Sequence, residues 1–162
     1  MALITQARDG ASLVRGITRI LGSGPGSLKT LTWELERAAE DPHASRRALI
    51  LYRAERLSYA EVDALARRLA QSYRARGVTR ESVVAVMVEN RPAYVLHLFA
   101  LWKLGAITAL VNPETQGPAL KHTLEACAAT HATIGSECLT QLRSILPELK
   151  ASLTANVYID MH

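Results

Sequence analysis

The stretch GSGPGSLKT, residues 22–30, combines three glycines with a lysine and a hydroxyl residue, as a phosphate-binding loop would. A P-loop requires glycine, four residues and then Gly-Lys-Ser/Thr, because glycine lets backbone N–H groups surround a phosphate while the lysine reaches over it. Counting back from Lys29, Leu28 and Ser23 occupy the two positions that must be glycine. A P-loop also follows a buried strand, whereas residues 3–21 have the pattern of an amphipathic helix. The stretch is therefore interpreted as a flexible linker.

The thiols and imidazoles do not form a metal-binding pattern. Cys127, His131 and Cys138 are spaced as C-x3-H-x6-C, which lacks a fourth ligand and matches no zinc site. His97 lies in an apolar segment and is interpreted as a core imidazole, and His122 has no carboxylate or cysteine at supporting distance. The sequence also lacks a nucleophile elbow and a pair of catalytic carboxylates. Residue types and spacing therefore predict no catalytic, cofactor-binding or metal-binding residue.

The composition indicates one globular domain. The chain has 162 residues, of which 49% are hydrophobic and 21% are charged. No apolar run reaches the roughly 18 residues of a membrane span. Two cysteines without a signal peptide favour a reducing cytoplasm. The basic excess lies in residues 1–80, but its arginines alternate with acids and only 5% of all residues are aromatic, so a nucleic-acid partner is not expected.

Hydrophobic periodicity predicts alternating strands and helices after the linker. The predicted strands are 48–52, 56–59, 83–88, 107–111, 132–135 and 156–160, and the predicted helices are 32–40, 59–76, 91–104, 118–130 and 137–146. The first two strands would form a small hairpin. Residues 83–88 are apolar at every position, as in a central parallel strand that is covered on both faces. The alternation predicts an α/β fold with a mostly parallel sheet flanked by helices.

Several residues are predicted to cap these helices. Thr32 would cap the first one, and Ser58 with Glu61 forms a capping box at the start of the second. Gly77 stands where the second helix would end in a left-handed residue. Asn90 would cap the apolar helix that follows, which has Pro92 in its first turn.

Ligands of parallel sheets bind beyond the carboxyl ends of the strands. The segments predicted to lie there are residues 89–91, residues 112–117, and Gly135 with Ser136. Asn112, which precedes a proline, is explained as a turn residue. Spacing and chemistry alone thus lead to an α/β domain and no further.

The order of three runs resembles the N-terminal region of the adenylate-forming acyl-CoA synthetases. The runs are ALILYRAERLSYAEVDALARRLAQSYRARGV, VVAVMVENRPAYVLHLFALWKLGAITALVNPETQGPALKHTL and ATHATIGSE. Within that family they are most similar to the long-chain and very-long-chain fatty acyl-CoA synthetases, also called fatty acid transport proteins. The resemblance extends from about Thr30 to about Glu137. It implies that residues 30–162 are an incomplete N-terminal portion of an AMP-binding domain, truncated before the phosphate loop. Residues 1–29, which precede the resemblance, are expected from their own pattern to be an amphipathic helix and linker.

The resemblance also implies an activity for a longer parent enzyme, which would convert fatty acid, ATP and coenzyme A to acyl-CoA, AMP and pyrophosphate with Mg. The family's phosphate loop, aromatic-Gly-Thr-Glu segment, ribose-binding aspartate and C-terminal lysine lie further along, so no site residue is carried over to this chain. This chain alone is expected to be inactive and to bind no cofactor. Its expected partners are the remainder of the parent enzyme and other copies of itself, and a fatty acid substrate is expected to bind through the full-length protein. The alternative is a short non-catalytic α/β interaction module that retains the scaffold.

Residues 3–21 lie outside the clear resemblance. Apolar residues recur there at helical spacing and arginines lie apart from them: Ile4, Ala7, Ala11, Val14, Ile17 and Leu21 against Arg8, Arg15 and Arg19. The pattern predicts an amphipathic helix that either packs on the enzyme or lies at the anionic inner face of a membrane.

Overall fold

In a computed structural model of the chain, the described residues are 30–149, 151–154 and 156–160. The chain divides into two compact units, Met1–Glu34 and Leu35–His162. The predicted amphipathic helix and most of the linker lie outside the described residues. Among the residues that are described, no helix has both the length and the apolar character needed to cross a membrane.

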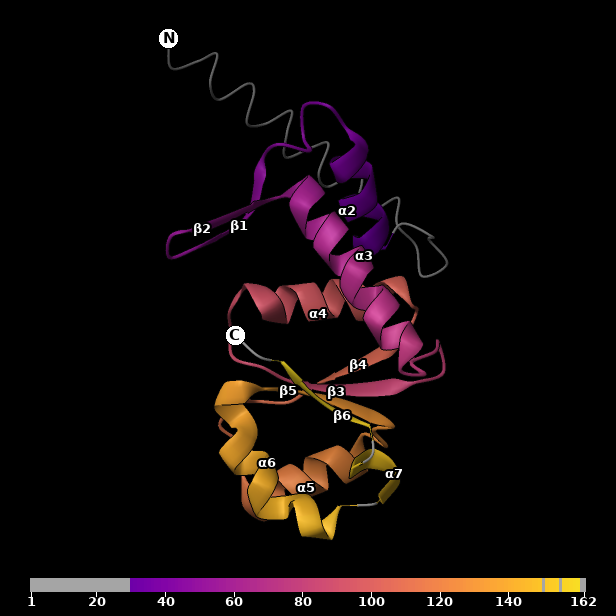
Figure 1. Cartoon of the computed structure of the whole chain (residues 1–162), viewed down its shortest axis with the longest axis vertical. Coiled ribbons are helices and arrows are strands. Elements are labelled where there is room, and N and C mark those ends of the chain that lie inside the picture. Colours follow the sequence, from indigo (N-terminus) through magenta and orange to yellow (C-terminus); the bar gives the residue numbers. More distant parts are fainter. Residues whose placement is uncertain (1–29, 150, 155, 161–162) are drawn as a thin grey trace, which may run out of the picture. The chain divides into compact units, whose positions relative to one another are not determined.

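The second unit is built on a four-stranded parallel sheet with the strand order β4-β3-β5-β6 (Figure 1). Its strands are β3 (Val83–Met87), β4 (Ile107–Leu110), β5 (His131–Gly135) and β6 (Val157–Asp160). The crossovers contain α4 (Pro92–Lys103), α5 (Gly117–Ala126), and a run of η1 (Ser136–Cys138), α6 (Leu139–Ile145), η2 (Leu146–Glu148) and α7 (Ala151–Thr154). The predicted parallel sheet is confirmed, and each of its strands begins and ends within one residue of the prediction.

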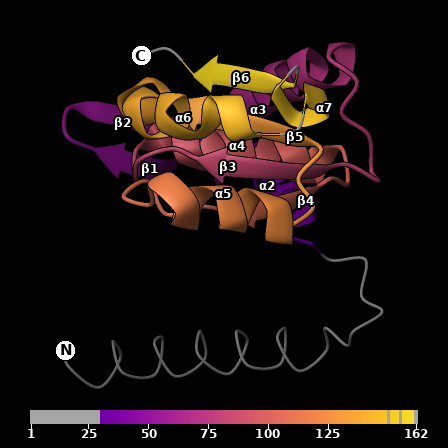
Figure 2. The same cartoon turned by 90° about the horizontal axis from the view of Figure 1, so that it is seen from below.

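Helices cover both faces of this sheet, with α3 and α4 on one face and α5 and α6 on the other (Figures 1 and 2). The central strand β3 contributes to both layers because successive side chains of a strand point to opposite faces. Val84 and Val86 belong to the core under α3 and α4, whereas Ala85 and Met87 belong to the core under α5 and α6. All four are fully buried, which confirms the prediction from the uninterrupted apolar run.

A two-stranded antiparallel hairpin precedes the sheet in sequence. β1 (Ala48–Tyr52) pairs with β2 (Glu55–Ser58), which confirms the predicted hairpin, although the second strand lies one residue earlier than predicted. Its turn includes Arg53 with a φ of 52°, in the left-handed region that side chains other than glycine rarely adopt.

The helix α3 (Tyr59–Ala75) begins and ends as its sequence predicts. Ser58 and Glu61 form the capping box, in which the Ser58 hydroxyl accepts a hydrogen bond from the Glu61 backbone N–H and the Glu61 carboxylate accepts one from the Ser58 backbone N–H. Gly77 follows the helix with a φ of +87°, so the left-handed residue is where it was expected.

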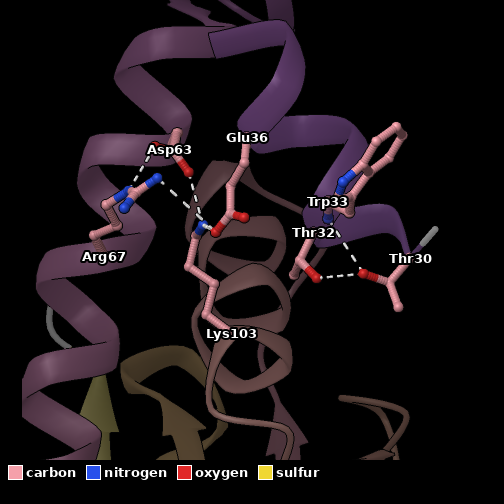
Figure 3. Close-up of polar contacts among 7 residues, drawn as sticks. All are labelled: Thr30, Thr32, Trp33, Glu36, Asp63, Arg67 and Lys103. Carbon is pink, nitrogen blue, oxygen red and sulfur yellow. Dashed lines mark hydrogen bonds and ion pairs between the residues drawn. The ribbon is translucent and has the colours of Figure 1, made fainter. Parts of the chain in front are cut away.

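The caps of two other helices differ from the prediction. The helix α2 (Leu31–Glu40) begins one residue early, because the Thr30 hydroxyl, and not that of Thr32, accepts a hydrogen bond from the Trp33 backbone N–H at 3.2 Å (Figure 3). The start of α4 is displaced in the other direction. Its N-cap is Arg91 in an extended conformation with no side-chain cap bond, because a proline disfavours a helical residue immediately before it. Asn90 is therefore not the cap.

Candidate functional site

The carboxyl ends of the parallel strands bring together the segments that the sequence predicts to face a ligand. Residues 89–91 follow β3, residues 112–117 follow β4, and Ser136 follows β5. Since β3 pairs with both β4 and β5, the three segments lie at neighbouring strand ends. The end of β6 at Asp160 adds a fourth segment, which sequence reasoning did not single out.

A pocket of about 360 Å³ lies at the ends of β3 and β4. It is lined by Val88, Asn90, Tyr94, Leu110, Val111, Asn112 and Pro113. Asn112 acts as the predicted turn residue, because its Oδ1 accepts a hydrogen bond from the Glu114 backbone N–H at 3.0 Å. The lining offers two amides and a tyrosine but no charged side chain. Such a surface suits an apolar or neutral group and lacks the cations that a phosphate needs.

On the other side of β3, Arg91 joins three strand ends. Its Nη2 lies 2.5 Å from Oδ2 of Asp160 and 3.4 Å from Oε2 of Glu137. The Glu137 carboxylate also accepts a hydrogen bond from the Glu89 backbone N–H at 2.8 Å. The Arg91 side chain is only 12% exposed and shares its charge between two carboxylates, so it is not available to an incoming phosphate.

The charges of this group hold one another ionised. Burial acts to raise the pKa of Glu137, but the hydrogen bond from Glu89 and the charge of Arg91 outweigh it, and the pKa is lowered from its ordinary value. Burial acts to lower the pKa of Arg91, but Asp160 and Glu137 outweigh it, and that pKa is raised. Both side chains therefore remain charged at neutral pH.

A buried polar chain continues from Asp160 into the core. His97 Nε2 lies 3.4 Å from Asp160 Oδ1, and its Nδ1 lies 2.7 Å from the hydroxyl of Tyr73. The same hydroxyl lies 2.6 Å from Thr133 Oγ1. Burial lowers the pKa of His97 and outweighs the opposing effect of Asp160, so the ring is neutral at neutral pH. The interpretation of His97 as a core imidazole is confirmed. Tyr73 satisfies its Nδ1, whereas its Nε2 faces Asp160 without forming a hydrogen bond.

A second cluster of charges joins α2, α3 and α4 (Figure 3). Lys103 Nζ lies 2.5 Å from Oε1 of Glu36 and 2.7 Å from Oδ1 of Asp63. The other oxygen of Asp63 accepts a hydrogen bond from Arg67 Nε at 2.7 Å. Burial acts to raise the pKa of Asp63, but the hydrogen bonds and charges of Lys103 and Arg67 outweigh it and lower that pKa. The cluster therefore links three helices, and the Lys103 ammonium group is paired with two carboxylates and is not available to a ligand.

The residues of the C-x3-H-x6-C pattern serve other contacts. His131 Nδ1 lies 2.9 Å from the Thr130 hydroxyl, and its ring stacks against that of Tyr158. Cys138 is buried, and burial raises the pKa of its thiol to about 11, so it is protonated and unreactive at neutral pH. Cys127 is half-buried and is also a free thiol. Cys127, His131 and Cys138 do not belong to any group of metal-binding side chains among the described residues.

Comparisons with known proteins agree on one family. The family model described as "AMP-binding enzyme" matches residues 35–161. The chain is 31% identical over 105 residues to long-chain fatty acid transport protein 6 of Mus musculus, and 33% identical over 117 residues to the medium/long-chain-fatty-acid–CoA ligase FadD6 of Mycobacterium tuberculosis. These alignments cover 64% and 72% of this chain but 17% and 19% of the relatives, so the chain spans about a fifth of their length.

Solved structures show the same fold. The N-terminal domain of FACL13 from Mycobacterium tuberculosis matches with a TM-score of 0.73 at 21% identity, over 82% of this chain and 34% of that one. The anthranilate CoA ligase AuaEII matches with a TM-score of 0.72 at 19% identity, over 83% of this chain and 25% of that one. At these identities the likeness establishes the architecture alone. It confirms the predicted α/β fold, with a parallel sheet flanked by helices.

Proposed function

This chain belongs to the AMP-binding enzyme family, and from that premise we propose that it is the N-terminal part of an ATP-dependent fatty acyl-CoA synthetase. The complete enzyme would join a fatty acid to ATP as an acyl-adenylate with release of pyrophosphate, and would then transfer the acyl group to the thiol of coenzyme A. The observation that carries the proposal is the family match over residues 35–161. The similarity of the chain to a fatty-acid–CoA ligase and to a fatty acid transport protein supports a fatty acid as the substrate of the complete enzyme.

The described residues do not fit a triphosphate or a magnesium ion. No three His, Cys, Asp or Glu side chains among them come together as a metal site would require. The two least exposed cationic side chains at the sites described above, Arg91 and Lys103, are each paired with two carboxylates. We therefore assign no step of the reaction to these residues, and we propose that they form the scaffold on which the catalytic segments of the longer enzyme are arranged.

Fatty-acid-dependent exchange between pyrophosphate and ATP tests the proposal. The longer protein should catalyse this exchange with a fatty acid and not without one. The 162-residue chain alone should catalyse none, because its described residues form no metal site and Arg91 and Lys103 are already paired, so they do not stabilise the charge that develops on the transferred adenylyl group. Exchange by the short chain would contradict the assignment of its residues to the scaffold, and no exchange by the longer protein would contradict the proposed activity.

The second candidate function is a non-catalytic α/β interaction module. The edge strand β4 favours it, since Ile107 and Leu110 are 59% and 56% exposed and could bind another protein segment. The coding sequence after His162 discriminates between the candidates. A Ser/Thr/Gly-rich phosphate loop within the next few dozen codons supports the synthetase, and a stop codon supports the module.

We further propose that the protein works in the cytoplasm. The composition supports this placement through its few cysteines. Residues 3–21 would either pack on the enzyme or contact the inner face of a membrane, and the second arrangement would suit an enzyme that takes fatty acids from a bilayer.

A further inference from the structure

The strand β6 ends at the edge of the sheet formed by the carboxyl ends of the strands, where ligands of parallel sheets bind. Among the strands that the structure describes, β6 lies at the edge of the sheet and pairs with β5 alone, so its carboxyl end has a described neighbouring strand on one side. Side chains add support, because both carboxylate oxygens of Asp160 are contacted, Oδ2 by Arg91 and Oδ1 by His97. Arg91 follows β3, so the contact ties the end of β6 across β5 to the central strand.

The partners of Asp160 are themselves held in place. The His97 side chain is 5% exposed, and its Nδ1 is hydrogen-bonded to the hydroxyl of Tyr73. The same hydroxyl is hydrogen-bonded to Thr133 of β5. A neutral ring that faces a carboxylate carries its proton on Nε2, so Tyr73 donates to Nδ1 and Thr133 donates to Tyr73. The hydrogen bonds are therefore donated in one direction, from Thr133 to Tyr73 and from Tyr73 to His97, whose Nε2 faces Asp160. Side chains held in this way have little freedom to move.

We propose that Arg91, His97 and Asp160 are positioning residues for acyl-adenylate formation, because they hold the carboxyl end of β6 in place at the edge of the sheet where ligands bind. The inference rests on the proposed function. In parallel sheets the segments that follow the strand ends surround the ligand, so a displaced strand end displaces the groups that follow it. Misplacement of reacting groups by about 1 Å can lower a rate by roughly 100-fold.

The test measures pyrophosphate exchange in the longer protein after the substitution Asp160→Asn. Asparagine keeps the shape of aspartate and can still present an oxygen to His97 Nε2, but it loses the charge that holds Arg91. We expect kcat to fall by about tenfold or more and the KM for the fatty acid to change less than about twofold. The double variant Arg91→Gln/Asp160→Asn should be no slower than the slower of its two single variants, because the two side chains act as one unit.

A matched control separates positioning from general loss of stability. Glu148→Gln removes one charge from an exposed ion pair, that with Lys121 at 3.5 Å, and should leave kcat unchanged. The melting temperature is measured for every variant. The inference is overturned if Asp160→Asn has the kcat of the control, or if its lost activity only follows the fraction of unfolded protein. If the unsubstituted longer protein shows no exchange, the proposed function fails and this inference fails with it.

Discussion

The substitution Lys103→Met should destabilise the fold through charges that it leaves buried. Methionine retains most of the length and apolar stem of lysine but removes the ammonium group that lies between Glu36 and Asp63. Asp63 is 10% exposed in its side chain and would keep only Arg67 as a partner. Glu36 is 39% exposed, and its remaining contact, to Arg67, is 3.9 Å long.

These exposures set the expected size of the effect. Removing one partner of a fully buried ion pair costs about 3–5 kcal/mol, whereas exposed pairs contribute about 0–1 kcal/mol. Asp63 is buried but keeps Arg67, and Glu36 can be hydrated where it is exposed. We therefore expect the free energy of unfolding to fall by about 2–3 kcal/mol, which corresponds to roughly 5–10 °C in melting temperature for a chain of this size.

Thermal unfolding followed by circular dichroism measures this change, at low protein concentration so that association contributes least. Lys121→Met is the matched control, because the pair that Lys121 makes among the described residues is with the 60% exposed Glu148. Its unfolding free energy should stay within about 0.5 kcal/mol of the unsubstituted chain. The double variant Lys103→Met/Asp63→Asn should be more stable than Lys103→Met, because it no longer buries a carboxylate that has lost one of its two cationic partners.

The same cluster predicts a dependence on pH. The pKa of Asp63 is lower in the folded chain than its ordinary value, so its contribution to stability is present above the unfolded pKa of about 3.9 and is lost as the pH falls through the folded pKa. Lys103→Met removes part of the cause of the lowered pKa, so the variant should lose less stability on acidification. The reasoning is refuted if Lys103→Met and the unsubstituted chain lose the same stability on acidification. It is also refuted if Lys103→Met lowers the free energy of unfolding at neutral pH by no more than Lys121→Met does.

Three further predictions concern other parts of the chain. Ser58→Ala should lower the unfolding free energy by about 1 kcal/mol through loss of the capping box, measured by urea unfolding, and an unchanged midpoint would contradict it. The chain alone should self-associate and bind a hydrophobic dye, and Ile107→Lys/Leu110→Asp should reduce both in sedimentation velocity and fluorescence; a monomer that binds no dye would oppose this. Deletion of residues 1–22 should abolish co-sedimentation with anionic vesicles if the helix lies at a membrane, and binding unaffected by the deletion would favour the packed helix.

Local signals in the sequence are sufficient for much of the fold. The uninterrupted apolar run of β3 predicts a strand that is buried on both faces, because only a strand covered on both faces keeps all of its side chains away from water. The capping box at Ser58 and the left-handed Gly77 fix both ends of α3, because capping depends on residues within one turn of the helix end. Elements whose boundaries are set by neighbours in sequence are therefore predictable.

The charged clusters could not be predicted in the same way. Arg91 meets Asp160 across 69 positions, and Lys103 meets Glu36 across 67, so their pairing depends on the finished packing of the sheet and helices. Only Asp63 leaves a local signal. It is next to Val62 on the buried stripe of α3, where an acid is costly unless a cation compensates it. The acid therefore predicts that a cationic side chain packs against it, but it does not indicate that this side chain is Lys103.

The apolar helix α4 shows where sequence and structure differ most informatively. Its nearly continuous apolar surface predicts burial on all sides, yet only Pro92, His97, Ala100 and Leu101 are buried. These residues include the contacts that α4 makes with the core under α3, and the other apolar side chains are half-buried. An apolar surface that one unit does not fully cover is expected where more polypeptide packs against it. The partial burial of α4 thus supports the proposal that further polypeptide packs against this helix.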